Sequence, residues 1–231
     1  MKKSHVVLVL IVIIAIGAFI TPAIDLPWAD FLNWGVLAAI LAILVCVALF
    51  FEFETAATSS KEIAIVAMLG TISAVLRVPF AAVPNVQPCT YLIICSGCVF
   101  GPVAGFTVGA ITALVSNFFL GHGPWTLYQM IAWGLAGLSA GYLNKLRLNR
   151  PLLIVLGILW GYLYGFITNI WFWTAFVYPL TLQTLIVTQV NTVWFDTVHA
   201  IGNAIFLGFL GRRTVVVLNR FKERFSITFI Q

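Results

Sequence analysis

Two long segments of this sequence carry no charged side chain. No Asp, Glu, Lys or Arg occurs in residues 78–144, and none occurs in residues 151–195. Hydrocarbon cannot solvate charge, and each helix that crosses a bilayer needs about 20 consecutive apolar residues. Uncharged segments of this length cannot form the surface of a soluble domain, so the sequence predicts an all-α, polytopic membrane protein.

Composition agrees with a membrane location. The chain is 62% hydrophobic and 8% charged, whereas an average soluble domain has about 25% charged residues. Its 231 residues can hold about six to eight membrane helices with short connections. We therefore expect any ATPase that supplies energy to be another polypeptide. The four cysteines, Cys46, Cys89, Cys95 and Cys98, lie in or beside apolar segments, which favours packing over a disulfide framework.

Apolar spans separated by proline and glycine predict about eight helices. The spans lie near 5–24, 32–51, 60–78, 89–101, 103–120, 126–143, 152–175 and 192–212. The fourth span is short for a full crossing and is expected to be tilted, re-entrant or partly buried in protein. The first span could be a cleaved signal peptide, but its apolar region is longer than the usual 7–15 residues, which favours an uncleaved anchor.

The basic residues predict the orientation of the chain. With eight crossings, eleven of the twelve Lys and Arg residues fall on the side of the two termini, and only Arg77 falls on the other. This bias predicts a multi-pass cell-membrane protein whose termini are both cytoplasmic. The basic clusters are interpreted as anchors that contact anionic lipid, so no nucleic-acid partner is expected.

Uncharged polar and aromatic side chains gather on the predicted outer side. Trp and Tyr there could form an interfacial belt, and any one amide could join two helices. Amides near hydrocarbon are costly without a partner, so their joint placement favours a ligand cavity. The expected substrate-binding residues are Arg77, Asn85, Gln87, Asn117, His122, Trp125, Tyr128, Gln129, Asn169, Trp173, Asp196 and His199.

Arg77 and Asp196 are each the only charge at the outer end of a helix. A mutual salt bridge and contact with a ligand both remain open for this pair. His122 and His199 lack the spacing of metal ligands, so no metal site is predicted.

Four stretches resemble one family of membrane proteins. They are residues 83–88 (VPNVQP), 96–105 (SGCVFGPVAG), 116–126 (SNFFLGHGPWT) and 132–137 (AWGLAG). They resemble the substrate-binding membrane subunits, or S components, of energy-coupling-factor (ECF) vitamin transporters, and the resemblance extends over roughly 61–213. Among these proteins the stretches look most like the cobalamin-type branch. Pantothenate, queuosine-like or other vitamin ligands also fit the side chains, and Arg77 would suit a carboxylate or a phosphate equally.

The resemblance implies a six-helix bundle that binds a vitamin near the outer face. Loops near 79–89, 120–126 and 176–191 would hold the ligand. The subunit would deliver its cargo inward after docking on a transmembrane scaffold and two ATPases, which use the ATP, so it needs no cofactor of its own.

The same resemblance divides the chain into three parts. Residues 1–55 would form an added N-terminal transmembrane hairpin, 56–213 the substrate-binding membrane domain, and 214–231 a basic cytoplasmic tail. Docking would use a small-residue face on the span 60–78. The family's Ala-x-x-x-Ala pattern is replaced there by Ala67, Gly70, Thr71 and Ala74.

Two other functions compete with this interpretation. A membrane enzyme would need paired acids, a metal cluster or a nucleophile with its base, and Asp196 is the only acid within the apolar core spans. A stand-alone secondary transporter commonly has embedded acids and paired repeats. The chain has one outer Asp and no obvious inverted repeat, so we expect a transport subunit that is not an enzyme.

Overall fold

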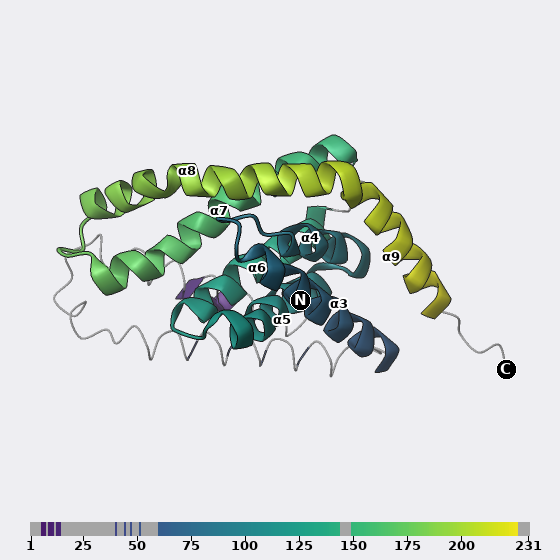
Figure 1. Ribbon diagram of the computed structural model, residues 1–231. Helices are drawn as coiled ribbons and strands as arrows, with labels where there is room; N and C mark the ends of the chain where they lie inside the picture. Colours follow the sequence, from purple (N-terminus) through teal and green to yellow (C-terminus); the bar gives the residue numbers. More distant parts are fainter. Residues whose placement is uncertain are drawn as a thin grey trace.

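The computed structural model describes residues 60–143 and 149–225, together with single positions between 6 and 51. Every described element is a helix (Figure 1). They are α3 (Ser60–Phe80), α4 (Cys89–Phe100), α5 (Pro102–Leu120), α6 (Trp125–Leu143), α7 (Arg150–Phe176), α8 (Leu182–Phe206), the π-helix η4 (Leu207–Gly211) and α9 (Arg212–Phe225). The predicted all-α fold is confirmed.

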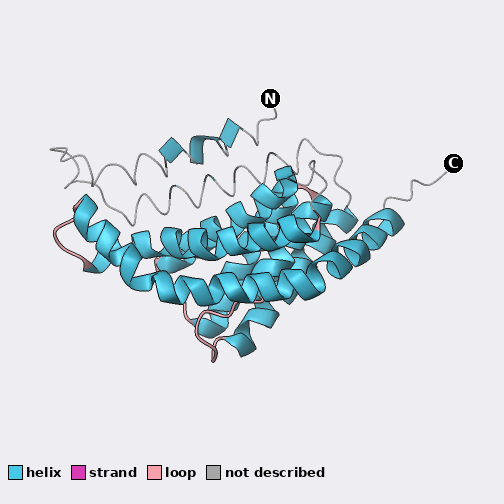
Figure 2. Ribbon diagram, turned by 90° about the horizontal axis from the view of Figure 1, so that it is seen from above, coloured by secondary structure: helices cyan, strands magenta, loops and turns pink. Residues whose placement is uncertain are grey.

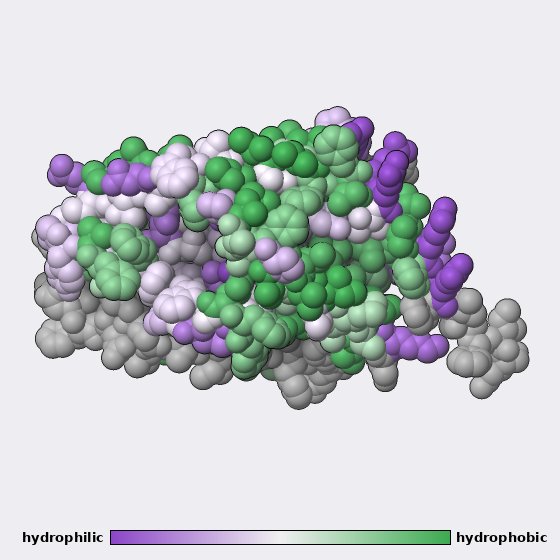
Figure 3. Space-filling view, viewed as in Figure 1, coloured by the Kyte–Doolittle hydropathy of each residue, from purple (hydrophilic) through white to green (hydrophobic). Residues whose placement is uncertain are grey.

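Several helices have the length and composition of membrane spans. Four candidate spans lie in the described chain, at Lys61–Phe80, Pro102–Leu120, Arg150–Phe176 and Leu182–Arg224. Apolar side chains cover much of the surface between the two ends of the bundle (Figure 3). A surface of this kind is expected where helices meet lipid.

The short helix α4 lies inside the bundle. Ten of its twelve residues, from Cys89 to Val99, are buried, and α4 packs against α5, α6 and α9. A helix surrounded by protein need not match the thickness of the bilayer, which accounts for the short predicted span.

Glycines bring α4, α5 and α6 into backbone contact. A Cβ atom added at Gly97 would lie 3.2 Å from Gly137 Cα, and one added at Gly105 would lie 2.6 Å from Gly97 Cα. Gly109 faces the backbone of Trp133 and Gly134 in the same way. The small-residue motifs of the sequence therefore join neighbouring helices of this chain.

The helix α8 begins earlier than the predicted span at 192. Thr181 caps it, and its hydroxyl accepts from the Thr184 amide at 3.2 Å in a capping box. The expected outer loop at 176–191 is thus reduced to 177–181. The polar residues after position 182 were interpreted as loop because of their polarity, but they lie on a helix and several of them face α7.

Residues at the start of the predicted basic tail form the helix α9. Leu218 is buried, and Lys222 Nζ donates to the Val99 carbonyl at 2.7 Å, so this helix packs on the end of α4. Hydrophilic side chains gather along α9 and the adjoining end of the bundle (Figure 3).

The predicted N-terminal hairpin lies largely outside the described residues, as does the question of whether the first span is cleaved. At its described positions, Val7 and Ile11 are buried in one cluster with Phe106 and Ala110 of α5. The 7/11 spacing places both N-terminal side chains on one helical face. These positions therefore pack on the side of the bundle formed by α5.

The two ends of the bundle are formed by different elements. The long helices α7 and α8 run side by side (Figures 1 and 2). The turn at 177–181 lies at one end of this pair, while α9 and the start of α3 lie toward the other end (Figure 1).

Candidate functional site

A hydrogen-bonded cluster is centred on Arg77, near the end of α3. Its Nη1 donates to Ser116 Oγ at 2.6 Å and to Asn117 Oδ1 at 2.7 Å, and its Nε donates to Gln87 Oε1 at 3.3 Å. Asn117 Nδ2 in turn donates to Gln129 Oε1 at 2.8 Å. We call these five residues the arginine network.

The arginine network joins residues from three helices and one loop. Arg77 comes from α3, Gln87 from the following loop, Ser116 and Asn117 from α5, and Gln129 from α6. Thr126 extends the network, because its Oγ1 accepts from Asn117 Nδ2 at 2.9 Å. Four predicted site residues, Arg77, Gln87, Asn117 and Gln129, are thus brought together.

A second group of side chains lies directly against Arg77. The guanidinium carbon is 4.8 Å from the centre of the Trp133 ring, a distance typical of a cation–π contact. Trp133 Nε1 donates to Thr90 Oγ1 at 3.0 Å, and the same hydroxyl lies 2.9 Å from His199 Nε2. Tyr164 packs on Trp133 and His199, with ring centres 4.6 and 5.0 Å away. We call Thr90, Trp133, Tyr164 and His199 the aromatic group.

Burial makes the charge of Arg77 costly. Arg77 is 7% exposed, and Ser116, Trp133 and His199 are fully buried. Its hydrogen-bonding partners are neutral amides and hydroxyls, and the part of the chain that the structure describes provides it with no carboxylate. A buried charge without a counter-charge is stabilised only in part by neutral acceptors.

The buried imidazole of His199 also has an unused polar atom. Its Nδ1 has no hydrogen-bond partner among the described residues, although the side chain is fully buried. Buried polar atoms of this kind are rare in folded proteins and call for an explanation such as a ligand.

Asp196 does not pair with Arg77 in the structure. Its Oδ2 accepts from Thr192 Oγ1 at 3.1 Å, and its carboxylate lies against Gly165 of α7. Of the two interpretations left open by the sequence, the mutual salt bridge is therefore not observed, because Arg77 turns toward α5 and Asp196 toward α7.

Polar side chains continue along the seam between α7 and α8. Asn169 Nδ2 donates to Thr192 Oγ1 at 2.7 Å and to Gln189 Oε1 at 3.1 Å. Farther along, Trp173 Nε1 donates to Thr184 Oγ1 at 2.9 Å. Asn169, Trp173 and Asp196 thus bond within this helix pair, beside the arginine network rather than in it.

The other predicted site residues lie around this core. Asn85 is buried and donates to the Phe195 carbonyl at 2.8 Å, so it joins the 81–88 loop to α8. His122 lies near Thr126 and packs edge-on against Phe118. Trp125 packs against Trp171 with ring centres 5.1 Å apart, and Tyr128 is half-buried on α6.

Sequence reasoning missed several members of the site. Ser116, Thr126, Thr90, Trp133 and Tyr164 were not among the predicted residues, although all are buried. Helical spacing could have indicated two of them, because Thr126 and Trp133 lie three and four residues from Gln129 and so share its face. No comparable pattern marks Thr90 or Tyr164.

The predicted docking residues divide into two pairs. Ala67 and Thr71 are exposed on α3, whereas Gly70 and Ala74 are buried. A Cβ at position 70 would lie 2.6 Å from Ile111 Cγ2 of α5. Gly70 and Ala74 therefore serve contacts within this chain, and only Ala67 and Thr71 are accessible to a partner.

Three of the four cysteines can be placed. Cys89, Cys95 and Cys98 are free thiols in the interior, while Cys46 lies outside the described residues. Cys95 Sγ lies 3.7 Å from the Gly211 carbonyl, and Cys98 Sγ lies 3.8 Å from the Ala140 carbonyl. These thiols pack helices together, as the sequence indicated.

Comparison with known proteins identifies one family. The family model described as "ECF transporter, substrate-specific component" matches residues 61–211. The matched segment begins in α3 and ends with η4, so it contains every residue of the arginine network and the aromatic group. No solved structure matches the chain.

Proposed function

Because the chain belongs to the family of substrate-specific components of ECF transporters, we propose that it binds a water-soluble vitamin or a vitamin precursor at the arginine network and the aromatic group. Its function is transport rather than catalysis. The ligand enters from the outer face and is delivered inward.

The observation that carries this proposal is the environment of Arg77. A buried guanidinium that bonds only neutral groups in the described chain can gain a stronger, charge-assisted bond from a carboxylate or phosphate. Trp133 and Tyr164 offer ring faces beside this charge. Together these groups suit a ligand with an anionic group and a flat or apolar portion.

The choice of vitamin follows from the inventory of side chains. Amides at Gln87, Asn117 and Gln129 suit a ligand rich in amide groups, and the adjacent rings suit apolar edges. Cobalamin combines both features and also contains a phosphodiester in its nucleotide loop, so we place a cobalamin-type ligand first.

The partners follow from the family. We propose that the chain docks on an ECF scaffold subunit and two ATPase subunits, which supply the energy for release. Ala67 and Thr71, on the exposed face of α3, are the proposed contact residues. Small side chains permit close approach of another membrane helix.

A binding screen tests the proposed ligand. Purified protein is titrated with cobalamin, cobinamide and a panel of anionic and neutral water-soluble vitamins, and heat release and thermal stabilisation are recorded. We expect one compound to bind with a micromolar or lower Kd and to raise the melting temperature. If no vitamin of either charge class binds, the proposal is wrong.

A second experiment separates this function from that of a stand-alone secondary transporter. Uptake of the ligand is measured in cells that contain the scaffold and active ATPases, and in cells whose ATPases carry an inactivating substitution. We expect uptake only with active ATPases. Equal uptake in both strains would favour an independent carrier.

A further inference from the structure

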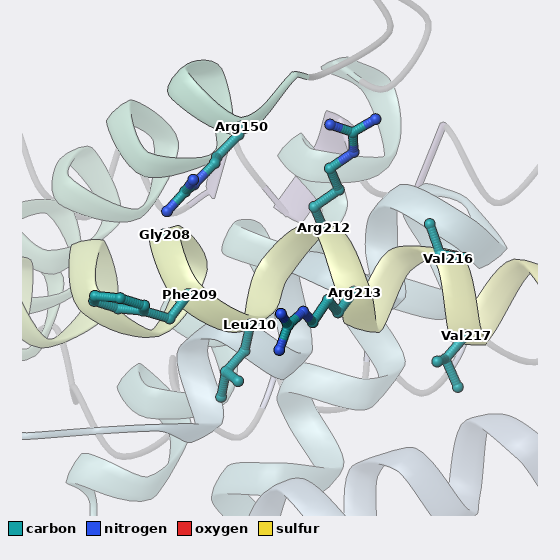
Figure 4. Close-up of a pocket in the computed structure, with 8 residues that line it drawn as sticks. All are labelled: Arg150, Gly208, Phe209, Leu210, Arg212, Arg213, Val216 and Val217. Atoms are coloured by element: carbon teal, nitrogen blue, oxygen red, sulfur yellow. The ribbon is translucent and has the colours of Figure 1, made fainter.

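A groove on the outside of the bundle, remote from the arginine network, opens between α7, η4 and α9 (Figure 4). It has a volume of about 800 Å³, within the range of ligand sites. Arg150, Arg212 and Arg213 line it together with apolar residues. We infer that this groove binds an anionic glycerophospholipid, whose phosphate contacts the arginines and whose acyl chain lies along the α7–α8 seam.

The charge of the groove matches a lipid phosphate. Arg150, Arg212 and Arg213 are exposed, and none of them is hydrogen-bonded or ion-paired with a residue that the structure describes. Figure 4 shows the Arg150 side chain extending from α7 toward Gly208 of η4, with Arg213 along the neighbouring helix. One guanidinium group can donate two parallel hydrogen bonds to two oxygens of a phosphate, which makes arginine well suited to this headgroup.

The groove continues into an apolar trough. A second hollow of about 400 Å³ shares Arg150, Gly208 and Phe209 with the first. On the α7 side it is lined by Ile154 and Ile158, which follow Arg150 at successive intervals of four residues and so share its helical face. Charged and apolar parts of the surface are therefore continuous, as they are in a phospholipid.

The length of the trough agrees with one leaflet of a bilayer. The trough extends along α7 from Arg150 to Tyr162, which at 1.5 Å per residue is about 18 Å. One leaflet contributes about half of the 30 Å hydrocarbon core, or about 15 Å. An acyl chain that starts at the arginines would thus lie against this trough over its full length.

The local backbone opens the groove. Residues Leu207–Gly211 form a π-helix, a rare element that is often found at functional sites. A Cβ at Gly208 would have Ile154 Cδ1 as its nearest neighbour, at 3.5 Å, so only a glycine-sized gap separates this position from the Ile154 wall of the trough. Phe209, 72% exposed, forms one wall.

The test uses the full chain in detergent. Native mass spectrometry measures binding of phosphatidylglycerol and, as a neutral lipid of the same chains, phosphatidylcholine. We expect phosphatidylglycerol to bind at least tenfold more tightly. The triple variant R150Q/R212Q/R213Q should bind the two lipids about equally, because each arginine contributes up to about fivefold to the preference.

The matched control removes the same charge elsewhere. Lys61, Arg220 and Arg224 are exposed and do not line the groove. The variant K61Q/R220Q/R224Q should retain at least half of the preference. An equal loss in both triple variants would mean that net charge alone attracts the lipid, and would overturn the proposal.

A second variant tests the acyl contact without changing charge. Gly208→Leu places a side chain in the trough and should weaken phosphatidylglycerol binding about tenfold, while Gly208→Ala should weaken it less. Unchanged binding in Gly208→Leu would overturn the acyl assignment. Full displacement of the lipid by millimolar inorganic phosphate would also overturn the proposal, because the site would then hold an ion only.

Co-purification of the same variants with the scaffold subunit would recognise a different occupant. If R150Q/R212Q/R213Q binds phosphatidylglycerol normally but no longer associates with the scaffold subunit, the groove is a protein contact and the lipid proposal is wrong.

Discussion

At the scale of single residues, Arg77 connects most of the polar core. It donates hydrogen bonds to the side chain of Gln87 in the loop after α3 and to two side chains of α5, and its charge lies over the ring of Trp133 on α6. Removing such a group from a ligand site should cost about 1.5–3 kcal/mol, the range for hydrogen bonds to charged groups.

We expect Arg77→Gln to weaken binding of the best vitamin ligand at least tenfold, because the charge that pairs with its anionic group is lost. Arg77→Lys, which keeps the charge without the planar fork, should fall between this variant and the wild type. Titration calorimetry measures both Kd values. Arg220→Gln, a charge change on the surface of α9, serves as the control. Wild-type affinity in Arg77→Gln would place the ligand elsewhere.

At the scale of elements, a glycine junction determines how α4, α5 and α6 meet. Gly97, Gly105 and Gly137 bring three backbones into contact, and this contact places Asn117 on α5 beside Gln129 on α6. The geometry of the arginine network therefore depends on residues that do not belong to it.

Gly137→Ala should destabilise the protein by about 1–3 kcal/mol, the usual cost of overpacking, because its Cβ would lie 2.9 Å from Gly105 Cα. The melting temperature of the purified protein measures the effect. Gly202→Ala is the matched control, since a Cβ there would have Val86 as its nearest neighbour at 3.6 Å. If both variants melt alike, the junction is less tightly packed than the structure indicates.

The face of α3 exposed at Ala67 and Thr71 belongs to the same scale. Ala67→Leu should reduce co-purification with the scaffold and ATPase subunits severalfold while vitamin binding is kept, because the larger side chain holds the partner helix away. Val155→Leu, on the exposed surface of α7, controls for a general surface effect. Loss of vitamin binding in Ala67→Leu would instead indicate a defect within the bundle.

Gly70→Leu provides the contrasting case. Its side chain would collide with Ile111 of α5, so we expect lower yield and loss of vitamin binding together. Retained vitamin binding at wild-type yield would contradict the α3–α5 contact.

At the scale of the whole molecule, basic side chains gather at the end of the bundle that includes α9, and uncharged polar side chains lie at the other end. The proposed import direction depends on which of these ends is outside. A single cysteine at His122 should react with an impermeant maleimide in intact cells, whereas one at Arg220 should react only after lysis. Both positions are exposed, and the four native cysteines are replaced beforehand. The reverse pattern would place the arginine network toward the cytoplasm and contradict uptake by this route.

Much of the fold could be predicted from the sequence because the bilayer makes helix formation a local matter. Each crossing segment must satisfy its own backbone hydrogen bonds, so apolar length and proline or glycine breaks are enough to locate it. The predicted spans from 60 to 175 agree closely with α3 to α7. The early start of α8 was missed because a polar helical face that packs on another helix has the composition of a loop.

The sequence by itself determined that this chain is a helical membrane protein with basic residues at one end, and it offered twelve candidate ligand-binding residues, of which Arg77, Gln87, Asn117 and Gln129 lie in one hydrogen-bonded network. Only the tertiary structure decided that Arg77 turns toward Asn117 and not Asp196, that Trp133 lies against Arg77 with Thr90 and Tyr164 around it, and that Gly70 faces inward. These choices depend on the rotation and separation of helices, which arise from contacts between glycines and side chains far apart in the chain. Local sequence patterns do not contain such contacts.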